Sequence, residues 1–193
     1  GIIDSYNAHN DVEYLNPETG EPYPIKGAAH IVFTYGGIGE GVIQNRGFDS
    51  KSWIRTRLIE GGVPNTEIAF MSDYKKTSQK EAMFREMREG KKKILIATPK
   101  NAGTGVNVQL RLKTLHYGMA PWNPADVEQP DGRIVRQGNQ NDEVELSRYA
   151  IKATYDETQW AMLSRKSRNV EDVLMGTYDG DVEDLSESSQ YAM

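Results

Sequence analysis

The sequence predicts an α/β domain in which a mainly parallel central sheet is flanked by helices. Two observations support this fold class. From His30 onward, short β-branched runs alternate with amphipathic segments, which is the pattern of parallel strands joined by helical crossovers. The 193 residues are enough for one domain of ordinary size with an extension, but too few for two full α/β domains.

Five strands and four helices are expected after residue 30. The strands are predicted at 30–35, 67–71, 93–97, 114–117 and 144–151. The helices are predicted from about 50 to 60, from 78 to 89, from 124 to 137, and from 156 onward. Gly61-Gly62 and Gly90 are expected to end the first two helices, and Ser78 with Glu81 is interpreted as a capping box.

The chain is expected to divide into three parts. Residues 1–29 are polar and turn-rich without a sustained apolar period, so they are interpreted as an extended lead-in or the remnant of a truncated element. Residues 30–176 are expected to form the core domain with its C-terminal helix. Residues 177–193 hold five acidic and no basic side chains and are interpreted as a disordered acidic tail.

The composition restricts the classes of protein that remain. The net charge is −5, but without the five acids of the tail the sequence has 23 acidic and 23 basic residues, so any nucleic-acid surface must be local. The absence of cysteine excludes a disulfide framework and a thiolate zinc site. No apolar run approaches the roughly 18 residues of a membrane helix. There is no secretory signal, and because the sequence lacks an initiator Met it is expected to be part of a longer, cytoplasmic protein.

The most informative stretch contains the pattern Gln-x-x-Gly-Arg-x-x-Arg. Its fixed residues are Gln129, Gly132, Arg133 and Arg136, at positions i, i+3, i+4 and i+7. On a helix this spacing puts all four on one face, so the two guanidinium groups project together. Paired planar donors suit a phosphate group. A stripe of ion pairs is the alternative interpretation of a generic Arg-x-x-Arg.

A second stretch places a buried apolar strand before a loop that contains glycines. Thr98, Lys100 and Thr104 supply side-chain donors there, while Gly103 and Gly105 let backbone N–H groups approach a phosphate closely. These features favour a loop that binds the phosphates of a nucleotide or of nucleic acid. A plain strand-to-helix turn is the alternative.

The groups that would complete an ATP site are missing from the sequence. There is no Gly-x-x-x-x-Gly-Lys-Ser/Thr phosphate loop, and neither Asp142 nor Asp156 follows the apolar strand that a Walker B acid requires. The magnesium ion is therefore expected to be held by another domain. His9, His30 and His116 are too scattered along the sequence to indicate a metal site, and each is interpreted as structural or solvated.

These motifs resemble those of superfamily 2 nucleic-acid motors of the Swi/Snf-like group. With Trp122-Asn123-Pro124 before it, the arginine-containing stretch resembles motif VI, and the glycine-containing loop resembles motif V. The resemblance covers residues 30–176, and it implies a RecA-like three-layer αβα domain, the second of the two that form such a motor. The sequence departs from the group at Pro99 in motif V and at Asn139, where Swi/Snf proteins usually carry Gln.

The resemblance implies that ATP binds between two RecA-like domains. It implies that Arg136 is the arginine finger that reaches the γ-phosphate held by the first domain, that Arg133 is a second phosphate contact, and that Gln129 orders the interface. The residues expected at the nucleotide are Gly105, Asn107 and Gly132.

The resemblance also implies contacts with the nucleic-acid backbone at the ends of several strands. Thr34 ends the strand that stands in the place of motif IV, and Ser72 follows the second strand, where a comparable loop touches the tracking strand. The expected set is Thr34, Ser72, Thr98, Lys100, Gly103 and Thr104. DNA is the expected nucleic acid, ahead of RNA.

The other implied partner is the first RecA-like domain of the same parent chain. Residues 68–71, 137–139 and 155–160 look most like helicase domains fused to adenine-specific DNA methylases in phages and conjugative elements, so a methylase domain is a further expected partner. The alternative from another class is a non-catalytic RecA-like module that binds DNA or a partner protein.

Overall fold

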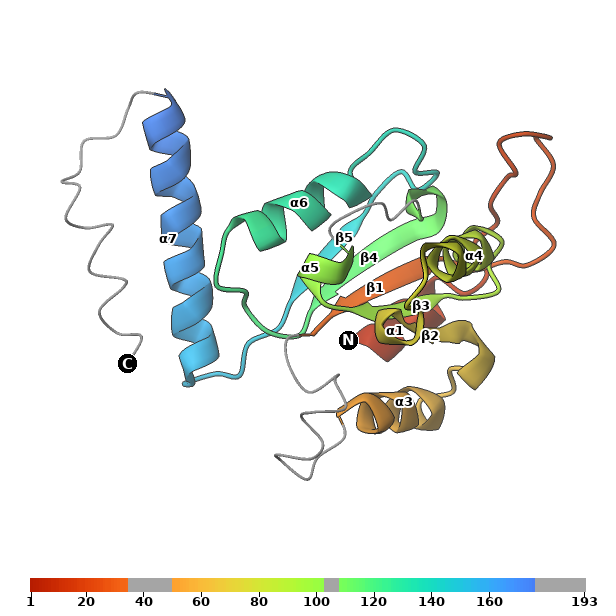
Figure 1. Ribbon diagram of the computed structural model, residues 1–193, viewed down its shortest axis with the longest axis horizontal. Helices are drawn as coiled ribbons and strands as arrows, with labels where there is room; N and C mark the ends of the chain where they lie inside the picture. The colour runs from red at the N-terminus through yellow and green to blue at the C-terminus, as the bar shows by residue number, and fades with distance from the viewer. Residues whose placement is uncertain (35–49, 103–107, 176–193) are drawn as a thin grey trace.

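A computed structural model describes residues 1–34, 50–102 and 108–175, except for the side chains of residues 50, 100, 102 and 170–174. At its centre lies one sheet whose five strands all run parallel, in the order β2-β3-β1-β4-β5 (Figure 1). The strands are β1 (Ala29–Phe33), β2 (Ile68–Phe70), β3 (Ile94–Ala97), β4 (Leu112–Tyr117) and β5 (Glu145–Arg148). The predicted α/β class with a mainly parallel sheet is confirmed.

The strand β3 is apolar at every position because both faces of the sheet are covered there. Leu95 of β3 belongs to the buried cluster on one face, whereas Ile94 and Ile96 belong to the cluster on the other face. This alternation is the two-residue period of a strand. A strand buried on both faces therefore appears in the sequence as a continuous apolar run.

Helices form the two outer layers (Figure 1). On one face the buried cluster includes side chains of α4 (Thr77–Arg88), α6 (Ala125–Ile134) and α7 (Tyr155–Met175). On the other face it includes those of α1 (Ile2–Ala8) and α3 (Ser50–Glu60). Of the helices in the described ranges, none has the length and apolar character needed to cross a membrane.

Residues 1–29 are part of this packing. The expectation of an extended lead-in is wrong for Ile2–Ala8, which is the helix α1, and the Tyr6 side chain of that helix is buried against the sheet. Further on, an antiparallel bridge joins Leu15 to Pro22. A helix of two turns presents too few apolar residues for a period to be recognised, which explains the miss. The division of the chain at residues 30 and 176 stays a prediction.

The glycines expected to end helices do so, and the structure shows why they are needed. α3 ends just before Gly61, where a Cβ atom would collide with the side chain of Ile3 in α1. α4 ends just before Gly90, whose φ is +84°. The predicted capping box is wrong, because α4 begins at Thr77 and the N–H of Lys76 donates to the side chain of Gln79 at 3.1 Å.

A buried arginine, Arg111, connects the N-terminal segment to the domain. Its guanidinium is fully buried, and it donates from Nε to the carbonyl of Arg88 at 2.6 Å and from Nη1 to that of Ile25 at 2.7 Å. The rings of Tyr14 and Tyr23 lie 5.0 and 4.7 Å from its central carbon. Backbone carbonyls and aromatic faces thus replace the water around Nε and Nη1, whereas Nη2 is buried without a hydrogen bond in the described residues. Burial also lowers the pKa of Arg111.

The three histidines that are scattered in the sequence form a row between α1 and the sheet. The ring of His30 lies 6.3 Å from that of His9 and 6.1 Å from that of His116. Both ring nitrogens of His30 are buried without a hydrogen bond, while Nδ1 of His116 is 2.9 Å from the Tyr149 hydroxyl. Burial lowers the pKa of His30 to about 3 and that of His116 to about 4.

We predict that the free energy of unfolding falls as the pH drops below 6.5, and that replacing His30 with Leu weakens this dependence. Both histidines are neutral when folded but bind protons near pH 6.5 once unfolded, so stability is complete above this pH and is lost toward pH 4. Each histidine contributes about 2 kcal/mol of loss between pH 6.5 and 5. Urea unfolding from pH 7.5 to 4.5 measures it, and an equal slope in His30→Leu would contradict the assignment.

Candidate nucleotide and nucleic-acid site

Three of the residues expected at nucleic acid lie along one edge of the sheet. Thr34 follows β1 and Thr98 follows β3, and the N–H of Thr34 donates to the carbonyl of Ala97 at 3.0 Å. Ser72 lies in the 3₁₀ turn Met71–Asp73 directly after β2. Because the strands are parallel, their carboxyl ends lie at the same edge of the sheet. Thr34, Thr98 and Ser72 therefore lie along this edge. The Thr34 hydroxyl is buried without a hydrogen-bond partner in the described part of the chain.

Thr98 begins a short helix and not the loop that the sequence predicts. The helix α5 (Pro99–Ala102) follows β3 at once, and the N–H of Asn101 donates to the Thr98 hydroxyl at 3.2 Å. Pro99 occupies the first helical position, where its missing N–H has no intrahelical partner to lose and its fixed φ suits the helix. This placement accounts for the departure from motif V at Pro99.

The rest of the predicted phosphate-binding loop lies outside the described residues. This applies to the side chain of Lys100 and to all of Gly103, Thr104, Gly105 and Asn107.

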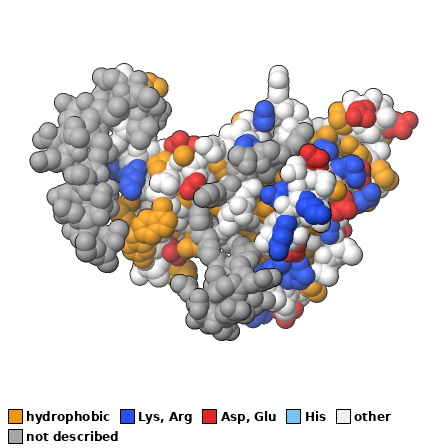
Figure 2. All heavy atoms as spheres, in the orientation of Figure 1, with side chains coloured by type: hydrophobic (Ala, Val, Ile, Leu, Met, Phe, Trp, Pro, Cys, Tyr) orange, Lys and Arg blue, Asp and Glu red, His pale blue; other side chains and the backbone are white. Residues whose placement is uncertain are grey.

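Two basic residues of α3 lie beside the turn that contains Ser72, and they were not predicted from the sequence. Asp73 forms ion pairs with Lys51 and with Arg55, the latter at 3.7 Å. Both cations also lie over the ring of Phe70, at 5.2 and 4.9 Å from its centre. Figure 2 shows Lys and Arg side chains gathered over α3 and α4 on this face of the molecule. The spacing of Lys51 and Arg55 at i and i+4 is the sequence pattern from which this pair of cations could have been predicted.

The predicted arginine helix is shorter than expected. α6 ends at Ile134, and Arg136 lies in the bend that follows, so the four motif residues do not share one continuous helical face. Gln129, Gly132 and Arg133 do share a side of α6, since they are three and four positions apart. Gln129, Gly132 and Arg136 are exposed, and Arg133 is half-buried. Within the described residues, the Arg136 side chain has no hydrogen bond or ion pair.

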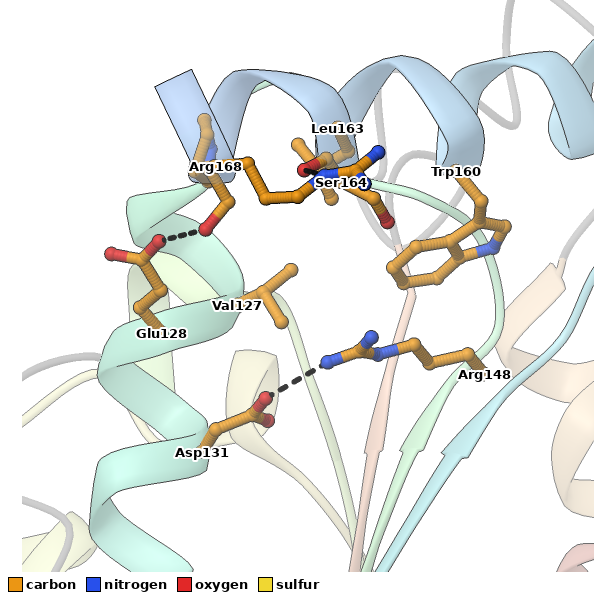
Figure 3. Close-up of a pocket in the computed structure, with 10 residues that line it drawn as sticks. Val127, Glu128, Asp131, Arg148, Trp160, Leu163, Ser164 and Arg168 are labelled. Atoms are coloured by element: carbon orange, nitrogen blue, oxygen red, sulfur yellow. Dashed lines mark hydrogen bonds and ion pairs between the residues drawn. The ribbon is translucent and has the colours of Figure 1, made fainter. Parts of the chain in front are cut away.

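Asp131 fixes the other side of α6. It accepts a hydrogen bond from the Tyr117 hydroxyl of β4 at 2.6 Å. It accepts another from Arg148 of β5 at 3.2 Å (Figure 3). Arg148 in turn lies over the ring of Trp160 in α7. Because Asp131 precedes Gly132 directly, these contacts set the rotation of α6 about its axis and therefore which residues it presents outward.

A hollow of about 280 Å³ lies between α6 and α7, lined by side chains that include Asp131, Arg148 and Trp160 (Figure 3). None of Gln129, Gly132, Arg133 and Arg136 lines it. The motif residues therefore face away from α7.

The helix of motif VI lies next to the residues that follow motif V. Arg133 and Pro130 line a small apolar hollow together with Val108 and Gln109, the first described residues after the glycine-containing loop. The arginine helix and the exit of that loop are thus neighbours, as the two motifs require if they serve one ligand.

Asn139 closes the bend that carries Arg136. Its side-chain amide donates to the carbonyl of Ile134 at 2.9 Å and to that of Leu112 at 2.8 Å, and its backbone N–H donates to the carbonyl of Arg136 at 3.2 Å. The amide therefore satisfies the last carbonyl of α6 and attaches the bend to β4. In the sequence, Asn139 is visible only as a departure from the group.

Gly132 faces open space. A Cβ atom built on it would have no described atom within 4 Å, and its φ is not in the left-handed region. Neither conformation nor packing in the described chain requires a glycine here.

Known proteins resemble this chain in sequence and in fold. Residues 49–138 match the family described as helicase conserved C-terminal domain. The chain carries a helicase C-terminal domain. Its αβα fold is that of solved domains of this class: the C-terminal part of the Fun30 ATPase domain (TM-score 0.53, 16% identity, 70% of this chain and 39% of that one) and the C-terminal domain of the DEAD-box protein Dbp5 (TM-score 0.51, 18% identity, 72% and 69%).

Three curated proteins are similar to this helicase domain. They are the defense against restriction protein B of Escherichia phage P1 (29% identity over 115 residues, 58% of this chain), the uncharacterized ATP-dependent helicase YqhH of Bacillus subtilis (31% over 128 residues, 66%) and the DNA repair protein RAD5A of Arabidopsis thaliana (36% over 98 residues, 50%). The chain spans 5%, 21% and 9% of their respective lengths. The predicted membership of superfamily 2, in its Swi/Snf-like group with a RecA-like fold, is confirmed.

We predict that Gly132→Ala stabilises the helicase domain by about 1 kcal/mol, the usual gain when alanine replaces glycine within a helix. No described atom opposes the added methyl group. Urea unfolding of the two chains measures the difference. A loss of stability would show that the glycine serves the fold of the chain itself.

Proposed function

We propose that this chain is the second motor domain of an ATP-dependent DNA helicase or translocase, to which it supplies the arginine finger and contacts with the nucleic-acid backbone. The observation that carries the proposal is the placement of Arg136. It is exposed on a short bend that Asn139 closes and that follows a helix held by Asp131. The backbone is thus secured while the guanidinium stays available, as a group that acts on a ligand of a second domain requires.

The open side of α6 supports an interface with a nucleotide. Arg133 would add a second phosphate contact beside Arg136, Gln129 would order the interface, and Gly132 would let the opposite domain approach the helix backbone. Gly105 and Asn107 are proposed to complete this side. ATP, when bound, supplies the anhydride that is hydrolysed, and the cations of Arg133 and Arg136 suit the charge that develops on its terminal phosphate. Its magnesium ion is proposed to be held by the first domain.

The carboxyl edge of the sheet supports a nucleic-acid surface. The Thr34 and Thr98 hydroxyls and Ser72 lie there, and Lys100, Gly103 and Thr104 are proposed to extend the set. Hydroxyl and backbone donors aimed at phosphates carry no base information, so binding should not depend on sequence. DNA is proposed as the partner because the sequence resemblance favours it over RNA. The first RecA-like domain and a methylase domain of the parent chain are the proposed protein partners.

We predict that the purified chain alone hydrolyses ATP no faster than background. The phosphate loop and the magnesium ligands are absent from its sequence, so the attacked phosphate would not be positioned. Phosphate release is measured with and without DNA. Turnover that persists through successive purification steps would refute the assignment to half of a motor.

We predict that Arg136→Ala in the full-length motor lowers kcat for ATP hydrolysis by on the order of 10³-fold, with little change in the dissociation constant of ATP. The loss falls on kcat because a finger acts mainly on the charge of the transition state. Arg165→Ala is the matched control, since Arg165 is an exposed arginine of α7. A fall in kcat of less than about tenfold for Arg136→Ala would show that this residue is not the finger.

A further inference from the structure

The N-terminal segment lies against the residues that directly follow the arginine bend. The side-chain amide of Gln140 pairs with the backbone of Leu15 through two hydrogen bonds, in which Leu15 N–H donates to Oε1 and Nε2 donates to the Leu15 carbonyl, each at 2.8 Å. The amide thus occupies the place of a neighbouring strand. Both of its polar groups are satisfied by one residue that is 125 positions away in the sequence.

A second connection starts at Tyr14. Its hydroxyl donates to Oδ1 of Asn141 at 2.7 Å, and Nδ2 of Asn141 donates to Oδ1 of Asn139 at 2.8 Å. Asn139 then donates to the carbonyl of Ile134, the last residue of α6. A continuous chain of hydrogen bonds therefore runs from the N-terminal segment to the helix end before Arg136.

Tyr14, where this series of hydrogen bonds begins, is held firmly in place. Its side chain is only 1% exposed, and its ring packs on the buried guanidinium of Arg111. Arg111 also binds the carbonyls of Ile25 and Gly27, at the far end of the same segment. The segment is held at both ends before it meets the arginine bend.

We infer that Tyr14, Leu15 and Gln140 are positioning residues for Arg136. The inference rests on the proposed function of Arg136 as the finger. Val135, Arg136, Gln137 and Gly138 are all exposed, so the course of the bend depends on where its ends are held. Asn139 attaches the bend to α6 and β4. The pairs Tyr14–Asn141 and Leu15–Gln140 hold the two residues that follow Asn139. A displacement of about 1 Å in a reacting group can lower a rate about 10²-fold, so small movements of this bend matter.

Two substitutions in the full-length motor test the inference. Tyr14→Phe removes one hydroxyl and keeps the ring on Arg111, and Gln140→Ala removes both bonds to Leu15. Each is expected to lower kcat for ATP hydrolysis about tenfold or more while KM for ATP changes less than about twofold, and to speed amide exchange at residues 135–139. Gln140→Glu, which keeps an acceptor for the Leu15 N–H, should restore part of the kcat.

Lys26→Ala is the matched control, because the Lys26–Glu13 ion pair lies in the same N-terminal segment at its exposed surface. It is expected to leave kcat and amide exchange unchanged. If Tyr14→Phe and Gln140→Ala keep kcat within twofold while Arg136→Ala in the same protein is inactive, the positioning role is refuted and the finger stands. If Arg136→Ala itself retains turnover, the proposed function is refuted, and the positioning role is refuted with it.

Discussion

The buried guanidinium of Arg111 is the constraint on which the arrangement of this domain depends. A cation removed from water needs substitutes for its hydration, and here three backbone carbonyls, which accept from Nε and Nη1, and two tyrosine rings provide them in part. Those carbonyls belong to the end of α4 and to the N-terminal segment. Gly90 is required beside it, since a Cβ atom there would collide with the guanidinium. One side chain thus sets the relative positions of α4, the start of β4 and the segment that contacts the arginine bend.

α6 shows how a helix can be rigid and available at once. Toward β4, β5 and α7 it is held by Asp131, with Tyr117 and Arg148 as partners. On the other side it presents Gly132 to open space, and its last carbonyl is satisfied by the Asn139 amide without any ligand. The Arg148–Asp131 contact is partly exposed, so its electrostatic contribution to stability is modest and its main effect is directional. Orientation, more than added stability, is what the acid provides.

Local signals in the sequence were enough to predict the sheet and several helix ends. Residues 94–97 are apolar at every position because both faces of β3 are covered, and Gly61 and Gly90 end helices for reasons visible in the chain itself. α1 was missed because two turns give no period. The end of α6 was placed three residues too late because the Asn139 amide that terminates it acts through tertiary contacts.

The candidate site was predicted in part for the same reason. The spacing of the motif correctly placed Gln129, Gly132 and Arg133 on one side of α6, but it did not predict that Arg136 lies beyond the end of the helix. The parallel sheet brought Thr34 and Thr98 to one edge, as the order of strands requires. Nothing local connects Tyr14 to Asn141 or Leu15 to Gln140, because those pairs form only when distant parts of the chain are folded together.

The pairing of Leu15 with Gln140 has a consequence for the order of folding. Closing a loop of this length carries a large entropic cost, which must be met by contacts formed earlier, such as the sheet and the burial of Arg111. On the ribosome, Gln140 emerges only after the strands β1 to β4 have been made. The bend that holds Arg136 is therefore among the last parts of the domain to acquire its final shape, and a chain stopped before residue 140 would lack the connection between this bend and Leu15.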